Sequence, residues 1–394
     1  MKRTVRDLVN LEGKVVLLRV DFNVPMDEGG KILDSTRIMQ SLPTIKYLIE
    51  QKAKVVIMSH LGRPKGFEIR KSLWPIALIL MRLLPTTVFF SNKVVGKEVE
   101  EQIKSMDNGD VLLLENVRFY QEEANCDMNF AKKIASMGDI FVNDAFGVAH
   151  REHATTYALA RLMPNAIGFL MEKEISALSG AVENPKKPFV VVIGGTKVSG
   201  KIKLILKLLQ VSDALLIGGA MAYTFLVASG YAVGRSFVDD QNVDYARDVL
   251  TVAESLGKRI VLPVDHVCLK EGSKKRKPFV SEELVDDMIA YDIGPKTIKL
   301  FSEEIKKAKQ VLWNGPLGKY EDSRFCEGTF DIAKAIADSN AYSIVGGGDS
   351  VSAVKKAGYE DKFDLISTGG GATLKYIEQG SLPCIDVIQE KIKL

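Results

Sequence analysis

Arginines follow several of the hydrophobic runs in the first 170 residues of this chain. Each run is short and rich in Val, Ile and Leu, which is typical of a buried parallel strand. The polar segments after these runs contain His60, Arg63, Arg118 and Arg151, while Arg37 opens a predicted helix. Guanidinium groups stay charged and grip phosphate or carboxylate oxygens in pairs, so arginines gathered at one rim suit a small polyanion. The alternative is scattered surface arginines paired with neighbouring acids.

Glycines take the same positions in the second half of the chain. They follow five hydrophobic runs, at Gly194-Gly195, Gly218-Gly219, Gly315, Gly346-Gly347-Gly348 and Gly369-Gly370-Gly371. Glycine lets a ligand approach the backbone, and N–H groups at the helix starts that follow bind phosphates. Lys197 and Lys201 follow the first pair, and Asp349 is a natural Mg²⁺ ligand beside phosphate oxygens and water. A tight turn explains any single pair, but five at one sheet edge predict a nucleotide platform.

Two familiar catalytic patterns are missing from the sequence. Residues 195–202 (GTKVSGKI) begin like the phosphate-binding motif GxxxxGK[ST], but Ile202 stands where a hydroxyl would bind Mg²⁺. The chain has no GxSxG motif, and covalent catalysis is not expected. His153 and His266 are interpreted as packing or surface histidines. An anion rim and a nucleotide rim without a nucleophile favour phosphoryl transfer, which needs positioning and charge neutralisation.

The elements that must position these residues alternate between strand and helix. Strands are predicted at 14–20, 54–58, 86–90, 110–114 and 139–143, then near 188–193, 213–217, 259–263, 309–313, 342–345 and 363–367. Helices are predicted between them, at 36–52, 75–84 and 127–137 among others. This alternation predicts an α/β fold with parallel sheets and right-handed crossovers. Typical sheet sizes favour two sheets of five or six strands, with ligands beyond the carboxyl ends of the strands.

A predicted helix followed by prolines divides the chain into two lobes. Residues 171–185 form this connecting helix, because Pro185 and Pro188 cannot continue it. One lobe is expected over residues 1–170 and a second over residues 186–375. The chain has 394 residues, of which 46% are hydrophobic and 26% charged. That composition excludes a disordered or low-complexity protein.

The net charge and the cysteines indicate which kinds of partner to expect and in which cellular compartment the protein works. With a net charge of +3, positive and negative residues are too nearly balanced for a nucleic-acid-binding surface. The basic cluster at 274–277 is interpreted as a solvated loop. The four cysteines are far apart, which favours reduced thiols in the cytoplasm, and residues 1–14 hold no apolar signal core. The uncharged run at 214–234 is long enough to cross a bilayer. Its glycines and polar residues favour a buried strand, a turn and a buried helix instead, so no membrane partner is expected.

Motifs of this chain resemble those of the phosphoglycerate kinase family over nearly its whole length. They run in family order: RVDFNVP (19–25), DSTRI (34–38), LPTI (42–45), MSHLGRPKG (58–66), LLENVRF (113–119), FVNDAFG (141–147), HREHAT (150–155), GGTKVSGKI (194–202), GGAMAYTFL (218–226), DIGPKT (292–297), WNGPLGKYE (313–321), GGGDS (346–350) and STGGGATL (367–374). The resemblance implies two Rossmann-like lobes joined by a hinge helix. It implies reversible phosphoryl transfer from 1,3-bisphosphoglycerate to Mg-ADP, giving 3-phosphoglycerate and ATP, in glycolysis and gluconeogenesis. It also implies a monomer whose residues 376–394 return to the first lobe.

The resemblance further assigns roles to single residues. The phosphoglycerate would be held by Asp21, Phe22, Asn23, Arg37, His60, Leu61, Gly62, Arg63, Arg118 and Arg151. The Mg-nucleotide would be held by Gly195, Lys197, Lys201, Gly294, Asn314, Glu321, Gly347, Gly348, Asp349 and Ser350. Glu321 would take the ribose hydroxyls and Asp349 the metal. Arg37 and Lys197, with backbone N–H groups near Gly347 and Gly370, would stabilise the moving phosphoryl group.

Two other function classes remain open from the sequence alone. One is a different kinase or acyl-phosphate enzyme on the same scaffold, and the other is a non-catalytic binding module descended from an enzyme. The presence of Arg37, Lys197 and Asp349 argues against the second class. If the two ligands bind to opposite lobes, the lobes must close to align donor and acceptor and to exclude water.

Overall fold

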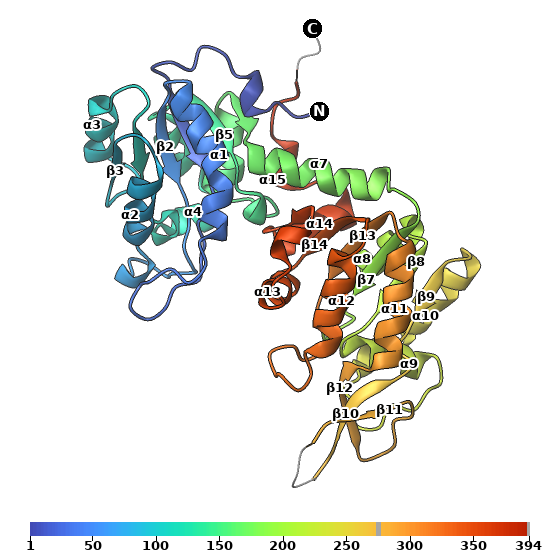
Figure 1. Cartoon of the computed structure of the whole chain (residues 1–394). Helices are drawn as coiled ribbons and strands as arrows, with labels where there is room; N and C mark the ends of the chain where they lie inside the picture. The colour runs from blue at the N-terminus through green and yellow to red at the C-terminus, as the bar shows by residue number, and fades with distance from the viewer. Residues whose placement is uncertain (273–276, 392–394) are drawn as a thin grey trace. The chain divides into compact units, whose positions relative to one another are not determined.

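The protein is described here by a computed structural model of residues 1–272 and 277–391. The chain forms two units: one comprises Met1–Ser176 with the segment from Ser381 onward, and the other comprises Ala177–Gly380. The boundary falls inside helix α7 (Phe169–Glu183) (Figure 1). Residues 274–276 of the basic cluster predicted as a solvated loop lie outside the described residues. No helix within the described ranges is both long and apolar enough to cross a membrane.

A parallel sheet of six strands forms the centre of the first unit, in the order β3-β4-β2-β1-β5-β6. Its strands are β1 (Val15–Arg19), β2 (Lys54–Met58), β3 (Val88–Phe90), β4 (Val111–Leu113), β5 (Ile140–Asn143) and β6 (Asn165–Ile167). The structure confirms the five predicted strands to within two residues at each end. The sixth strand, β6, was missed because its three residues contain no hydrophobic run.

Helices connect the strands of this sheet, and several of them bury apolar residues. They are α1 (Thr36–Glu50), α2 (Trp74–Leu83), α3 (Lys97–Ser105), α4 (Gln121–Ala124), α5 (Met128–Ala135), α6 (Leu159–Leu162) and α15 (Pro383–Asp386). In α1, Ile38, Leu42 and Ile45 recur at helical spacing and join the buried core around β1 and β2. This packing fixes Arg37 at the first turn of α1, beside the carboxyl ends of the strands.

The second unit repeats this architecture with a parallel sheet in the order β15-β14-β13-β7-β8-β9. Its strands are β7 (Phe189–Ile193), β8 (Ala214–Ile217), β9 (Arg259–Val261), β13 (Gln310–Asn314), β14 (Tyr342–Gly346) and β15 (Leu365–Ile366). Its helices are α8 (Ile202–Val211), α9 (Met221–Ala228), α10 (Val243–Ser255), α11 (Pro295–Lys307), α12 (Glu327–Ala337), α13 (Gly348–Lys356) and α14 (Gly371–Gln379). All six predicted strands are confirmed. Strand β8 and helix α9 also confirm the strand–turn–helix interpretation of the long uncharged run.

A small antiparallel sheet in the second unit was not predicted. It consists of β10 (His266–Lys270), β11 (Phe279–Ser281) and β12 (Met288–Ile293), in the order β11-β10-β12. In β10, His266 and Cys268 are buried, whereas Val267 and Leu269 between and beside them are partly exposed. Such alternation marks a sheet with one face toward solvent, and it lacks the continuous hydrophobic run by which the parallel strands were recognised.

Segments from both ends of the chain pair within the first unit. The Arg3 N–H donates to the Gln389 carbonyl at 2.8 Å, and the Lys391 N–H donates to the Met1 carbonyl at 2.9 Å. The Cys384 N–H donates to the Ala149 carbonyl at 3.1 Å. The last of these contacts joins α15 to the segment that follows β5.

A carboxyl group is buried directly after β5, at Asp144. Its Oδ1 accepts a hydrogen bond from the Met171 N–H at 3.0 Å. Burial is the largest cause that raises the pKa of this group from 3.8 to about 6. The pKa of Asp144 is higher in the folded protein than in the unfolded chain. Its contribution to the free energy of unfolding is therefore complete below pH 3.8 and is lost as the pH rises through 6.

Asp144→Asn is therefore expected to raise the free energy of unfolding at pH 8 by up to about 3 kcal/mol, from 1.36 kcal/mol per pKa unit. The amide keeps an oxygen for Met171 and removes the need to bury a charge. The two proteins should approach equal stability at pH 4. Urea unfolding from pH 4 to pH 8 measures the difference, and exposed Asp107→Asn is the control. A difference that does not change with pH would contradict this prediction.

Candidate active site

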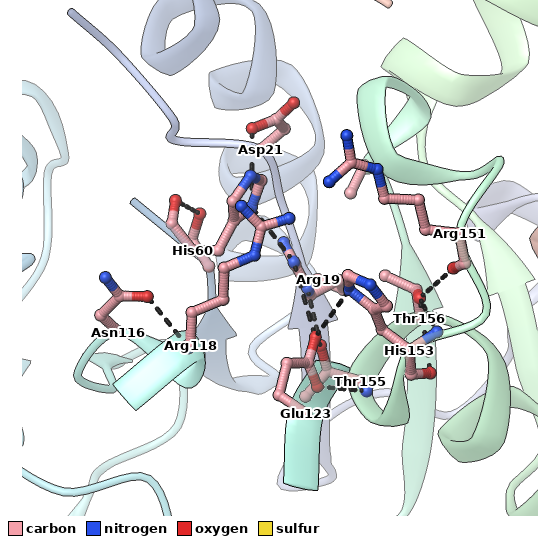
Figure 2. Close-up of polar contacts among 12 residues, drawn as sticks. Arg19, Asp21, His60, Asn116, Arg118, Glu123, Arg151, His153, Thr155 and Thr156 are labelled. Atoms are coloured by element: carbon pink, nitrogen blue, oxygen red, sulfur yellow. Dashed lines mark hydrogen bonds and ion pairs between the residues drawn. The ribbon is translucent and has the colours of Figure 1, made fainter. Parts of the chain in front are cut away.

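The carboxyl ends of the strands bring the predicted arginines of the first unit to one edge of its sheet. Asp21 follows β1, His60 follows β2, Arg118 follows β4 and Arg151 follows β5, and Figure 2 shows their side chains around one space. Arg37, from the start of α1, places Nη1 2.8 Å from Asp21 Oδ2. The Nδ1 atom of His60 lies 3.8 Å from Asp21 Oδ1. The sheet therefore gathers these residues as the sequence analysis expected.

The loops that carry these side chains are joined to one another by hydrogen bonds. Asn23 Oδ1 accepts a hydrogen bond from the Gly62 N–H at 2.8 Å, and Arg118 Nη1 donates to the Gly62 carbonyl at 2.6 Å. Gly62 has a φ of +63°, a conformation that favours glycine. The side chains of Phe22 and Leu61 are buried, whereas Arg63 is exposed.

Two charged residues that the sequence analysis missed lie under this edge. Arg19, the last residue of β1, is fully buried; its Nε donates to Thr155 Oγ1 at 2.9 Å and its Nη2 lies 3.3 Å from His60 Nδ1. Glu123 of α4 is also fully buried, with Oε1 4.0 Å from Arg19 Nη2. It accepts hydrogen bonds from the N–H and the hydroxyl of Thr155, at 2.9 and 2.7 Å. Arg19 ends a hydrophobic run, and that position is the signal that could have identified it.

Arg151 is held by the segment around it and by the end of the chain. The Arg151 carbonyl accepts hydrogen bonds from Thr156 Oγ1 at 3.1 Å and from the Cys384 thiol at 3.2 Å. Its Nε lies 3.1 Å from His150 Nε2. His153 points its Nδ1 to within 3.8 Å of Glu123 Oε1, so the structure places it in the buried network beside the arginines (Figure 2).

Positive charge exceeds negative charge at this edge. Its charged residues are Arg19, Arg37, Arg118 and Arg151, against Asp21 and Glu123. Burial, and then the nearby arginines, lower the pKa of Arg118 to about 10 and of His153 to about 4. The same two causes hold the pKa of His60 well below 6.5. At pH 7 Arg118 is therefore charged and these two histidines are neutral, an arrangement suited to a bound anion.

The second unit contains a pocket of about 310 Å³ at the carboxyl ends of its strands. The pocket is lined by Gly195, Thr196, Gly219, Ala220, Tyr223, Phe237, Ile289, Ala290, Tyr291, Pro316, Gly318, Lys319, Glu321 and Asp349. We call it the glycine-edge pocket. Of the predicted nucleotide residues, it brings together Gly195, Glu321 and Asp349. Its aromatic walls and exposed carboxylates provide both a flat apolar surface and polar hydrogen-bond acceptors.

Other predicted nucleotide residues connect the strand-end loops instead of lining this pocket. Lys201 Nζ donates to the carbonyls of Gly194, at 2.7 Å, and Asn314, at 3.4 Å. Burial lowers the pKa of Lys201 to about 8, and the charge of Asp349 opposes this shift. Asn314 Nδ2 donates to the Gly346 carbonyl at 2.7 Å.

Three more of the predicted nucleotide residues also lie outside the lining of this pocket. Ser350 Oγ accepts a hydrogen bond from the Gly315 N–H at 2.6 Å. Gly294 precedes α11, and a Cβ added there would lie 2.4 Å from Asp265 Cγ. Lys197 is exposed in the loop before α8.

The glycines of the second unit fall into two groups. A Cβ on Gly194 would lie 2.1 Å from the Pro316 oxygen, and one on Gly219 would lie 2.6 Å from the Gly195 nitrogen. These glycines let neighbouring loops pack on one another. Gly348 and Gly370 have open space around a Cβ, and they stand at the starts of α13 and α14. Helix starts of this kind leave N–H groups available to a phosphate.

A metal at this edge would need ligands from outside the protein. In residues 1–272 and 277–391 no group of three or more His, Cys, Asp or Glu side chains is placed to hold a metal ion. Asp349 offers a single exposed carboxylate at the first turn of α13, beside the glycine-edge pocket. That arrangement fits Mg²⁺, which binds through one or two carboxylates together with substrate phosphates and water.

Comparisons with known proteins agree over nearly the whole chain. The sequence profile of the phosphoglycerate kinase family matches residues 5–380. Phosphoglycerate kinase of Dictyoglomus turgidum is 49% identical over 395 residues, covering 99% of this chain and 100% of that protein. The enzyme of Aquifex aeolicus is 47% identical over 393 residues, covering 99% of each. The structure of phosphoglycerate kinase from Coxiella burnetii superposes with a TM-score of 0.88 at 39% identity, covering 98% of both chains. The crystal structure of the Pyrococcus horikoshii OT3 enzyme gives 0.84 at 34% identity, also covering 98% of both chains.

Proposed function

The chain belongs to the phosphoglycerate kinase family, and from this premise we propose which of its residues carry out the reaction. The protein is a phosphotransferase that moves a phosphoryl group reversibly between 1,3-bisphosphoglycerate and ADP, giving 3-phosphoglycerate and ATP. The observation that carries the residue assignment is the cluster of charged arginines at the strand ends of the first unit. The glycine-edge pocket of the second unit supports the assignment of the nucleotide.

The first unit holds the phosphoglycerate in this proposal. Arg63, Arg118 and Arg151 bind its phosphate and carboxylate oxygens, because guanidinium groups pair with such oxygens and remain charged. Asp21 orients Arg37 through their 2.8 Å ion pair. Asn23, at the same edge, also holds the phosphoglycerate. His60 is neutral at pH 7 and provides a hydrogen bond without adding charge.

The second unit holds the nucleotide. The base lies against the walls of the glycine-edge pocket, and Glu321 accepts hydrogen bonds from the ribose hydroxyls. The helix starts at Gly348 and Gly370 bind phosphate oxygens through backbone N–H groups, with Lys201 beneath the loops. Asp349 supplies the carboxylate for Mg²⁺, which would neutralise phosphate charge when bound.

Transfer proceeds without a covalent enzyme intermediate. Arg37 and Lys197, with backbone N–H groups near Gly347 and Gly370, stabilise the charge spread over the moving phosphoryl group. Because the two substrates bind to separate units in this proposal, the units must close for transfer to occur.

We also propose that the protein acts as a cytoplasmic monomer without nucleic-acid partners. Light scattering after size exclusion tests the monomer.

A coupled assay tests the reaction directly. Purified protein is given ATP and 3-phosphoglycerate, and 1,3-bisphosphoglycerate formation is followed through a dehydrogenase. We expect turnover that requires Mg²⁺ and falls to background when another hydroxy acid replaces 3-phosphoglycerate. Turnover only with another acid would reject the substrate, and nucleotide binding without turnover would reject the enzyme.

Asp349→Asn tests the assignment of the metal ligand. Loss of the carboxylate charge should raise the Mg²⁺ concentration for half-maximal activity on the order of tenfold, about 1.4 kcal/mol. The KM for 3-phosphoglycerate should change little. Exposed Asp361→Asn is the matched control. An unchanged Mg²⁺ dependence in Asp349→Asn would remove this residue from the metal site.

A further inference from the structure

A second and larger cavity lies in the second unit, outside the glycine-edge pocket. Its volume is about 710 Å³, and the two share no lining residue. It is bordered by α9, α10, β9, β10 and the segment between β11 and β12 (Figure 1). None of the residues assigned above to the reaction lines it. We call it the second cavity. Its volume is in the range that holds small molecules.

The walls of the second cavity are mainly apolar. They include Leu226, Ala232, Leu250, Ile260, Leu262, Pro263, Val264, Leu284 and Val285. Several side chains there remain open to water: Tyr231 is 65% exposed, Val264 47% and Val285 49%. A ligand with an apolar ring would remove this surface from water, which is the main favourable contribution to binding at such a site.

Two polar side chains of the second cavity already have partners. Ser229 Oγ donates to the Phe225 carbonyl at 2.9 Å, and the Glu282 carboxylate pairs with Lys296 Nζ at 2.5 Å. His266 differs from them. It is among the residues that line the cavity, it is 3% exposed, and its Nδ1 has no hydrogen-bond partner among the described residues. A buried imidazole with an unused nitrogen gains free energy when a ligand supplies the missing hydrogen bond.

Charge at the second cavity selects against anions. Glu283 lines it with an exposed carboxylate, whereas the exposed carboxylate of Glu282 is paired with Lys296. Burial lowers the pKa of His266 to about 4, so the imidazole carries no compensating charge at pH 7. A second nucleotide or a phosphorylated acid is therefore disfavoured here. The two cavities adjoin but share no lining residue: the ring of Tyr223, in the glycine-edge pocket, packs 5.4 Å from the ring of His266.

We propose that the second cavity is a binding site for an uncharged aromatic molecule with one hydroxyl or N–H group. The ring lies among Leu226, Leu250 and Leu262, and the polar group bonds to His266. This site does not depend on the proposed function, because none of its residues takes part in the transfer.

Titration calorimetry of the full chain with 2-naphthol tests this site at pH 7. Wild-type protein is expected to bind one equivalent, with or without saturating MgATP. The anion 2-naphthoate, which has the same rings, should bind at least tenfold more weakly. Leu250→Trp fills the cavity and His266→Phe keeps the ring packing without the nitrogen, so each should weaken 2-naphthol binding at least fivefold. Val252→Trp, on the same helix but outside the lining, should bind like wild type.

Kinase turnover and thermal unfolding of each variant show that it is folded. Equal affinity of wild type, Leu250→Trp and His266→Phe would overturn the proposal, as would equal affinity for 2-naphthoate. Displacement of 2-naphthol by MgATP would place the probe in the glycine-edge pocket and also overturn it. Failure of kinase turnover in wild type would reject the proposed function and leave these binding outcomes unaffected.

Discussion

Arg37→Ala is expected to lower kcat of phosphoryl transfer by about 10²- to 10³-fold, the loss typical when one donor to a developing negative charge is removed. The guanidinium stands at the first turn of α1 and is held 2.8 Å from Asp21. Its position is therefore set before substrate arrives. In our proposal it meets the phosphoryl group mainly in the transition state, so the KM for 3-phosphoglycerate should change far less than kcat.

Arg63→Ala is the matched comparison. Arg63 is exposed in the loop after β2, and we assign it to binding of the ground-state substrate. Its removal should raise KM for 3-phosphoglycerate and leave kcat nearly unchanged. Arg37→Lys should recover only part of the lost rate, since an ammonium keeps the charge without the two-pronged geometry. Steady-state kinetics in both directions measure these effects, and equal, small effects of Arg37→Ala and Arg63→Ala would refute the assignment.

Glu123→Ala is expected to destabilise the first unit by about 3–5 kcal/mol, as is usual when one member of a buried ion pair is removed. The carboxylate is fully buried, lies 4.0 Å from Arg19 and accepts two hydrogen bonds from Thr155. Without it, the buried Arg19 guanidinium loses its nearby negative charge. The Thr155 N–H and hydroxyl lose their acceptor in the same step.

The neighbouring Glu122→Ala provides the control, because Glu122 lies on the same helix and is exposed. It should change stability by less than about 0.5 kcal/mol. The two tryptophans, Trp74 and Trp313, lie in different units, so single-tryptophan forms report the unfolding of each unit in urea. A similar loss of stability in both variants, or a loss confined to the Trp313 signal, would contradict this account.

The parallel strands and the charged strand ends were the predictable part of the molecule. A strand buried on both faces is hydrophobic along its length, so runs such as residues 15–18 and 55–58 stand out without any partner being known. Topology then places the residues that follow those runs at one edge. This is why Arg118 and Arg151 could be grouped from the sequence, although 33 positions separate them.

The buried charges and the small antiparallel sheet were not predictable in the same way. Arg19 and Glu123 have side chains that normally face water, and only the tertiary contacts with Thr155 and His60 show why they are inside. The glycines after the strands look alike in the sequence, but the structure gives two different reasons for them. Gly194 is needed because another loop passes within contact distance, whereas Gly348 stands in open space at a helix start. A sequence shows the residue type but not what lies beside it.

The return of the chain to the first unit sets an order of events during synthesis on the ribosome. Residues 177–380 are contiguous, so the second unit has all its parts as soon as it leaves the exit tunnel. The first unit must wait for α15 and for the residues that pair with Arg3 and Met1. The unit translated first is therefore completed last. Until then, the surface that α15 later covers is accessible to chaperones and proteases.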